Sequence, residues 1–133
     1  MSEVFADTNF WVALTNPNDR WHSAARAAAR ELAPRHLVTT EDVLTEFLAF
    51  LAEQGTQFRQ VATLTLRSIL LDVEVVLQTH DGLLAALAYC ESRPDKGYSL
   101  TDCVSMTFMH ARGITDVLTN DERFRQEGFR TLL

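Results

Sequence analysis

Two aspartates stand just after apolar runs that are expected to form strands. Asp7 directly follows the run 4–6, and Asp121 comes shortly after the run 114–118. Because the carboxyl ends of parallel strands meet at one edge of a sheet, these two side chains are expected to lie close together. Ligands of parallel sheets bind at that same edge, so chemistry is expected there first.

Two further acids lie on predicted helices. Asp102 falls in the first turn of a helix that Ser99 is expected to open. Glu46 lies on the helix predicted over 41–54, at the border between its polar side and an apolar face that includes Phe50. Both acids are therefore candidates to join the two aspartates in one site.

Each acid also has a purely structural explanation. Asp7 and Asp121 could cap the helices that begin just after them, because aspartate is a favoured N-cap residue. Ser99 and Asp102 fit a capping box, in which an acid near the helix start reaches back to the cap. Glu46 could simply be solvated at the edge of its helix. Taken one at a time, the acids leave both interpretations open.

Taken together, the four acids point to a metal-dependent reaction. Several carboxylates in one place repel each other and destabilise a fold unless a cation neutralises them. Ligation by oxygen alone suits hard divalent ions such as Mg²⁺ or Mn²⁺. Such ions activate water and stabilise the oxygens of a phosphodiester during hydrolysis. The predicted metal ligands and catalytic residues are Asp7, Glu46, Asp102 and Asp121.

The elements that must position these acids alternate along the chain. Strands are predicted over residues 4–6, 36–39, 73–77 and 114–118, with a last edge strand over 129–133. Helices are predicted over residues 8–14, 20–32, 41–54, 57–70, 81–92, 99–112 and 121–127. Asp19 is expected to cap the second of these helices. This alternation predicts an α/β fold, a three-layer sandwich whose mostly parallel central sheet of four to five strands is flanked by helices.

The bulk composition is that of an ordinary folded domain. The 133 residues are 47% hydrophobic and 23% charged, which predicts one domain over residues 1–133. No apolar stretch of about 18 residues and no signal peptide is visible, so we expect a cytoplasmic protein with no membrane partner. The two cysteines, Cys90 and Cys103, are expected to be buried thiols in a reducing cytosol.

The net charge of −6 does not by itself indicate a nucleic-acid partner. Bound divalent cations would reverse the local charge of an acidic site. Two groups of arginines could meet RNA phosphates or an acidic partner, or simply be solvated: Arg26 and Arg30, and Arg123, Arg125 and Arg130. Three aromatic residues could stack on a base: Phe10, Trp11 and Trp21. Packing in the core is the alternative, because aromatic residues at helical spacing mostly fill cores.

Four short motifs resemble those of a known family. The run Asp7-Thr8-Asn9 after an N-terminal strand looks like the opening motif of PIN-domain nucleases. The stretches 43–47 and 99–102 resemble the segments that carry the second and third acids of that family. The stretch 118–124 is similar to the fourth, which typically reads Thr-x-Asp followed shortly by Phe. Each motif alone is weak, but all four occur in order over essentially the whole chain.

The resemblance implies an activity and a set of partners. It implies a metal-dependent endoribonuclease that hydrolyses RNA phosphodiester bonds with the four acids as ligands of Mg²⁺ or Mn²⁺. It implies supporting roles near the first and last acids for Thr8, Asn9, Thr119 and Asn120. Short members of the family are similar to VapC-type toxins of toxin–antitoxin pairs, which implies an antitoxin partner and a homodimer. Two alternatives stay open, a PIN-fold nuclease for housekeeping RNA processing and a non-catalytic α/β binding module.

Overall fold

The centre of the molecule is a five-stranded parallel sheet. The computed structural model describes residues 2–133. The strands are β1 (Glu3–Ala6), β2 (His36–Thr40), β3 (Glu74–Val76), β4 (Asp116–Leu118) and β5 (Arg130–Thr131). They lie in the order β3-β2-β1-β4-β5, and each neighbouring pair is parallel. The predicted parallel sheet, with its last strand at an edge, is confirmed.

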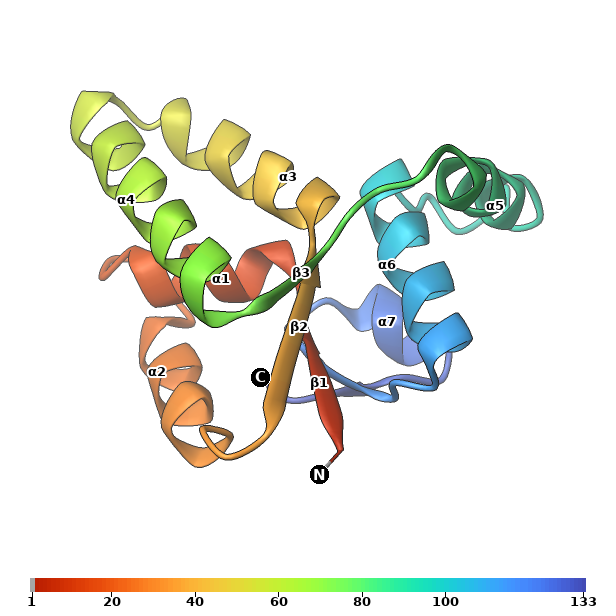
Figure 1. Cartoon of the computed structure of the whole chain (residues 1–133), viewed down its shortest axis with the longest axis horizontal. Coiled ribbons are helices and arrows are strands. Elements are labelled where there is room, and N and C mark those ends of the chain that lie inside the picture. Colours follow the sequence, from red (N-terminus) through yellow and green to blue (C-terminus); the bar gives the residue numbers. More distant parts are fainter. Residues whose placement is uncertain (1) are drawn as a thin grey trace.

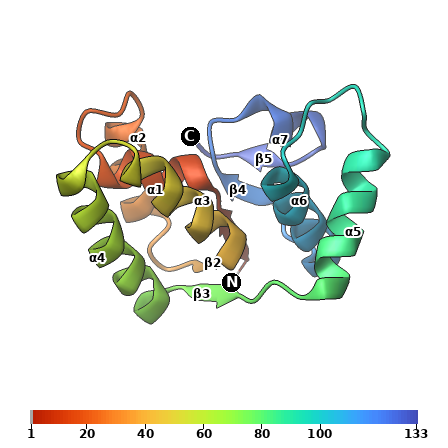
Figure 2. The same ribbon diagram turned by 90° about the horizontal axis from the view of Figure 1, so that it is seen from above.

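Seven helices in the described part of the chain cover the two faces of this sheet. They are α1 (Thr8–Thr15), α2 (His22–Glu31), α3 (Glu41–Ala52), α4 (Thr56–Asp72), α5 (His80–Glu91), α6 (Leu100–Arg112) and α7 (Glu122–Gln126). Figure 1 and Figure 2 show α1 to α4 on one side and α5 to α7 on the other. The predicted three-layer sandwich is therefore confirmed.

The apolar residues form a core between the sheet and its helices. Val4, Phe5 and Ala6 of β1 are fully buried, because helices cover both faces of this central strand. Phe47 from α3 and Phe124 from α7 are also fully buried in the same core. Among residues 2–133, the structure contains no helix that is both long enough and apolar enough to cross a membrane.

The direction of the helices brings several helix starts to the carboxyl edge of the sheet. Helix α3 begins directly after β2, so its first residues lie at that edge. Helix α6 leads into β4, and it must run opposite to the strands because β4 is parallel to β1. At its far end Gly113 adopts a left-handed conformation (φ 74°) that closes the helix before β4. The first turn of α6 therefore also lies at the carboxyl edge.

The structure decides two local predictions around the first helices. Phe10 and Trp11 are only 1% and 4% exposed, so they pack in the core and cannot stack on a base. The predicted cap at Asp19 is wrong, since α2 begins at His22 and its cap position is Trp21. The Asp19 carboxylate instead accepts a hydrogen bond from the backbone N–H of Trp21 at 2.8 Å, which stabilises the turn before the helix.

The prediction of two free thiols is also wrong. Cys90, in the last turn of α5, and Cys103, in the first turn of α6, are joined by a disulfide with their Cα atoms 6.0 Å apart. The pairing follows from the close packing of α5 against α6, which the spacing of two cysteines in a sequence does not reveal. The cysteines therefore give no support to the prediction of a reducing cytosol.

Candidate active site

All four predicted acids line one cleft at the carboxyl edge of the sheet. Asp7 follows β1, Glu46 lies on α3, Asp102 lies in the first turn of α6 and Asp121 precedes α7. The cleft has a volume of about 440 Å³ and is also lined by Thr8 and Asn9. Segments far apart in the sequence thus bring their carboxylates into one cavity, as the parallel topology predicts.

Asp7 is the most deeply buried of these acids, with only 4% of its surface exposed. It occupies the cap position of α1, but its side chain makes no capping hydrogen bond. Burial raises the pKa of Asp7 to about 7, and the nearby carboxylates of Asp102 and Glu46 act in the same direction. Hydrogen bonds from the Thr8 backbone and the Thr119 hydroxyl only partly offset this rise. The capping explanation therefore does not account for Asp7.

The hydroxyl of Thr119 links the first and last acids. Its Oγ1 lies 3.0 Å from Asp7 Oδ2 and 2.9 Å from Asn9 Oδ1, and its single proton serves one of them at a time. The same oxygen accepts a hydrogen bond from the backbone N–H of Asp121 at 3.1 Å. The Asn9 amide in turn donates to Asn120 Oδ1 at 3.1 Å. Thr119 and Asn120 thus lie behind the cleft and hold its walls together.

We expect Thr119→Val to lower the free energy of unfolding by about 1–3 kcal/mol. Valine has the shape of threonine but leaves the buried carboxylate and the Asp121 N–H without their partner. Urea denaturation followed by circular dichroism measures the loss, and Thr119→Ser, which keeps the hydroxyl, is the matched control. Equal stability of the valine variant and the wild type would show that this hydroxyl does not hold the cleft together.

Glu46 is held toward the cleft by a neighbouring helix. The Thr8 hydroxyl on α1 donates a hydrogen bond to Glu46 Oε1. Glu46 is partly buried rather than fully solvated, which argues against the interpretation as a free surface glutamate. Its position at the border of the apolar face of α3 therefore turns it toward α1 and the other acids.

Asp102 and Asp121 both take part in helix capping, as the structural explanation proposed, but capping does not use up either carboxylate. Asp102 Oδ2 accepts the backbone N–H of Ser99 at 3.0 Å and completes the predicted capping box. Asp121 Oδ1 accepts the backbone N–H of Arg123 at 3.0 Å. Each cap engages one oxygen and leaves the other oxygen of the same carboxylate for a further ligand. Capping and metal binding are therefore compatible at both positions.

Two residues of the cleft, Asp19 and Phe50, were not predicted from the sequence to lie there. Asp19 lines the cleft because the turn between α1 and α2 folds back toward it. Phe50, predicted on the apolar face of α3, is 49% exposed and lies at the rim of the cleft. Its place one turn after Glu46 was the available signal. Arg123, one of the arginines considered for RNA phosphates, brings a positive charge into the same cleft.

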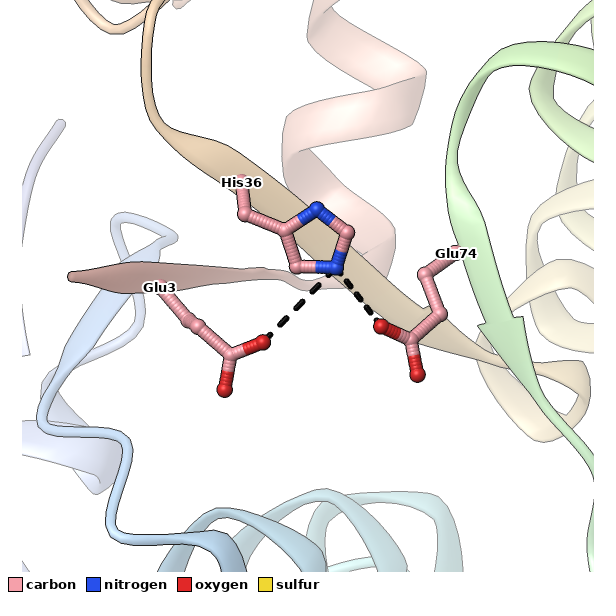
Figure 3. A group of neighbouring side chains, drawn as sticks. All are labelled: Glu3, His36 and Glu74. Carbon is pink, nitrogen blue, oxygen red and sulfur yellow. Dashed lines mark hydrogen bonds and ion pairs between the residues drawn. The ribbon is translucent and has the colours of Figure 1, made fainter. Parts of the chain in front are cut away.

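A second group of possible ligands lies at the opposite end of the strands. Glu3, His36 and Glu74 have ligand atoms within 4.8 Å of one another, and Figure 3 shows the His36 ring between the two carboxylates. The guanidinium of Arg112 lies 2.6 Å from Glu3 Oε2 and 2.7 Å from Glu74 Oε1. Because this arginine already pairs with both carboxylates, we interpret the group as an ion-pair network.

The network predicts a pH-dependent contribution to stability. The hydrogen bonds from Arg112, and then His36, lower the pKa of Glu74 from 4.5 to about 2. A lowered carboxylate pKa stabilises the fold above the unfolded value, and this contribution is lost as the pH falls from about 4.5 to about 2. Because the side chains are partly exposed, we expect Arg112→Gln to cost at most about 1 kcal/mol near neutral pH.

Chemical denaturation of Arg112→Gln across this pH range tests the expectation. Arg67→Gln is the control, because the described residues offer Arg67 no ion pair. The difference between Arg112→Gln and the wild type should narrow toward pH 2, and a constant difference would contradict the assignment.

The four acids of the cleft fit a hard divalent cation. The donors are all oxygens, and one of them belongs to a carboxylate that burial keeps from ionising freely. In residues 2–133, the group with all ligand atoms within 4.8 Å is the Glu3 network and not these acids.

Comparisons with known proteins agree with this fold and show the family. The family model described as PIN domain matches residues 4–129. The 23S rRNA-specific endonuclease VapC20 of Mycobacterium tuberculosis is 30% identical over 127 residues, which cover 95% of both chains. The crystal structure of VapC20, described as a sarcin–ricin loop cleaving toxin, superposes with a TM-score of 0.85 at 27% identity over 95% of each chain. DNA-bound VapBC of Salmonella typhimurium has the same fold, with a TM-score of 0.71 at 16% identity over 98% of this chain and 97% of the other.

Proposed function

Since this chain belongs to the PIN domain family, we propose that it is a divalent-metal-dependent endoribonuclease and the toxin of a toxin–antitoxin pair. One observation carries the proposal: four carboxylates from distant segments line a single cleft, and the most buried one has a pKa raised to about 7. A cluster of this kind is unfavourable in a metal-free protein and is typical of a site built for cations.

The proposed ligands are Asp7, Glu46, Asp102 and Asp121. A divalent cation held by these oxygens supplies a Lewis acid that favours hydrolysis of a phosphodiester. Mg²⁺ and Mn²⁺ are the proposed ions, because both prefer oxygen donors. The proposed domain is the whole chain, residues 1–133, since the core joins β1 to elements as late as α7.

The supporting residues have separate roles in this proposal. Thr119 and Asn9 orient Asp7 and fix its distance from the loop that carries Asp121. Thr8 directs Glu46 toward the same cavity. At the rim, the exposed ring of Phe50 offers a surface on which a nucleotide base can stack. In this proposal, these side chains position the cation ligands and provide a contact for one base of the substrate.

Relatives support an RNA substrate and a protein partner. VapC20 is named a 23S rRNA-specific endonuclease, and we propose ribosomal RNA of the cytoplasm as the first substrate to test.

Apolar side chains are strongly exposed on α4 and beside α5, with Leu64, Leu71 and Leu77 68%, 85% and 69% exposed. Large exposed apolar groups mark protein–protein contacts, so we propose that an antitoxin and a second copy of this chain cover these surfaces. A short reading frame next to the gene would favour this toxin role over housekeeping RNA processing.

Cleavage assays test the proposal directly. A mixed RNA pool and a sarcin–ricin loop hairpin are incubated with the wild type and with Glu46→Gln, in Mg²⁺, in Mn²⁺ and in EDTA. We expect discrete cuts that need the metal and disappear in the variant. Cutting that persists in EDTA would overturn the metal dependence. A folded protein that neither cuts RNA nor binds Mn²⁺ would favour a non-catalytic binding module.

A further inference from the structure

One positive charge lies inside the acidic cleft. Among the described residues that line it, Arg123 is the only cation, and it shares the cleft with the carboxylates of Asp7, Asp19, Glu46, Asp102 and Asp121. The neighbouring arginines point elsewhere: Arg125 pairs with Glu122, and Arg130 pairs with Asp116. Of the three arginines near the fourth acid, the structure therefore selects one for a role in the site.

The main chain of Arg123 is fixed, whereas its side chain is only lightly held. Its backbone N–H donates to Asp121 Oδ1 at 3.0 Å, which ties the residue to the start of α7. Its side chain makes one ion pair, from Nη1 to Asp102 Oδ2 at 3.2 Å, and 47% of that side chain is exposed. A single, half-exposed ion pair of this kind is weak and can be exchanged for another.

The partner of Arg123 in this ion pair, Asp102, is itself a candidate for another cation. Asp102 is a proposed metal ligand, and a divalent cation at Asp102 would compete electrostatically with the guanidinium for the same carboxylate. Once released, a guanidinium anchored beside the cleft has N–H donors arranged for a phosphate group. RNA phosphates are the anions that the proposed reaction would bring there.

We propose that Arg123 exchanges one anionic partner in the site for another. It pairs with Asp102 while the site lacks metal, and it binds a phosphate of the RNA backbone when the metal takes over that carboxylate. The inference rests on the proposed nuclease function and adds to it how the site controls access to Asp102. It assigns no chemical step to Arg123, which binds and positions the substrate.

Two binding measurements test the exchange apart from cleavage. Calorimetric titration with Mn²⁺ alone should give a severalfold tighter affinity for Arg123→Gln than for the wild type, because a competing cation is gone. Binding of the sarcin–ricin loop hairpin with Ca²⁺ should weaken about tenfold in Arg123→Gln, and the slope of log affinity against log salt should fall by about 1. Arg123→Lys should restore the salt slope but not the full affinity.

Arg125→Gln is the matched control, since Arg125 lies two residues along the same helix and outside the cleft. It should bind Mn²⁺ and RNA like the wild type. An Arg123→Gln protein with wild-type Mn²⁺ affinity, RNA affinity and salt slope would overturn the inference and leave the nuclease function intact. A wild type that neither binds Mn²⁺ nor cuts RNA would instead overturn the proposed function, and the inference would fall with it.

Discussion

Asp7→Asn is expected to reduce RNA cleavage at least about 100-fold, because several kcal/mol of transition-state stabilisation depend on a correctly held cation. Asp7 is the buried carboxylate that lies 3.0 Å from the Thr119 hydroxyl and interacts electrostatically with the nearby acids. Asparagine keeps the size of the side chain and one acceptor oxygen, but it removes the negative charge that the cation needs. Cleavage of the hairpin in Mg²⁺ measures the loss, and Asp81→Asn on the exposed start of α5 is the control.

The same substitution should make the metal-free protein more stable at alkaline pH. The pKa of Asp7 rises from 3.8 to about 7 on folding, so the folded state holds its proton more tightly than the unfolded state. Ionisation of Asp7 therefore costs stability that grows between about pH 4 and 7 and is complete above pH 7, on the order of 4 kcal/mol.

Melting temperatures in EDTA check this second expectation. Asp7→Asn should melt at a higher temperature than the wild type near pH 8 and at a similar temperature near pH 4, where both forms are neutral. A variant that cuts RNA at the wild-type rate, or that is less stable than the wild type near pH 8, would contradict the role given to Asp7.

Phe47→Ala is expected to lower the free energy of unfolding by about 3–5 kcal/mol, a large part of the stability of an ordinary domain. The ring of Phe47 is fully buried where α3 packs on the core, and the truncation leaves a cavity there. Phe50 lies on the same helix but is 49% exposed, so Phe50→Ala should change stability by less than about 1 kcal/mol.

Urea denaturation of the two phenylalanine variants separates packing from function. Phe47→Ala should lower the denaturation midpoint sharply, whereas Phe50→Ala should remain near the wild type and lose RNA affinity instead. Similar stabilities for the two variants would mean that α3 does not depend on Phe47 to hold Glu46 at the cleft.

The sequence predicted the frame of the site well because that frame depends on local patterns. Apolar runs and helix caps marked where strands end and helices begin, and parallel topology then brought Asp7 and Asp121 to one edge. The capping box at Ser99 and Asp102 was also visible, since it involves neighbouring residues. Features set by close sequence neighbours could therefore be predicted.

The remainder depends on contacts between distant elements, which no local pattern contains. The direction of Glu46 depends on Thr8 from another helix, and the Cys90–Cys103 disulfide depends on how α5 packs on α6. The exposure of Phe50 could not be predicted from its apolar neighbours on α3, and its place one turn after Glu46 was the one signal that set it beside the cleft. Helical periodicity predicts which face of one helix is apolar, but it does not predict which other elements pack against that face.

The most direct test of a metal site in the cleft is calorimetric titration of the RNA-free protein with Mn²⁺. Three variants separate the two acidic groups: Asp102→Asn changes the cleft, Glu74→Gln changes the Glu3–His36–Glu74 network, and Asp81→Asn changes an exposed acid outside both. A metal site in the cleft predicts that Asp102→Asn weakens Mn²⁺ binding at least about tenfold, while the other two variants bind like the wild type. Binding that survives Asp102→Asn and is lost in Glu74→Gln would contradict it and move the metal to the opposite end of the sheet.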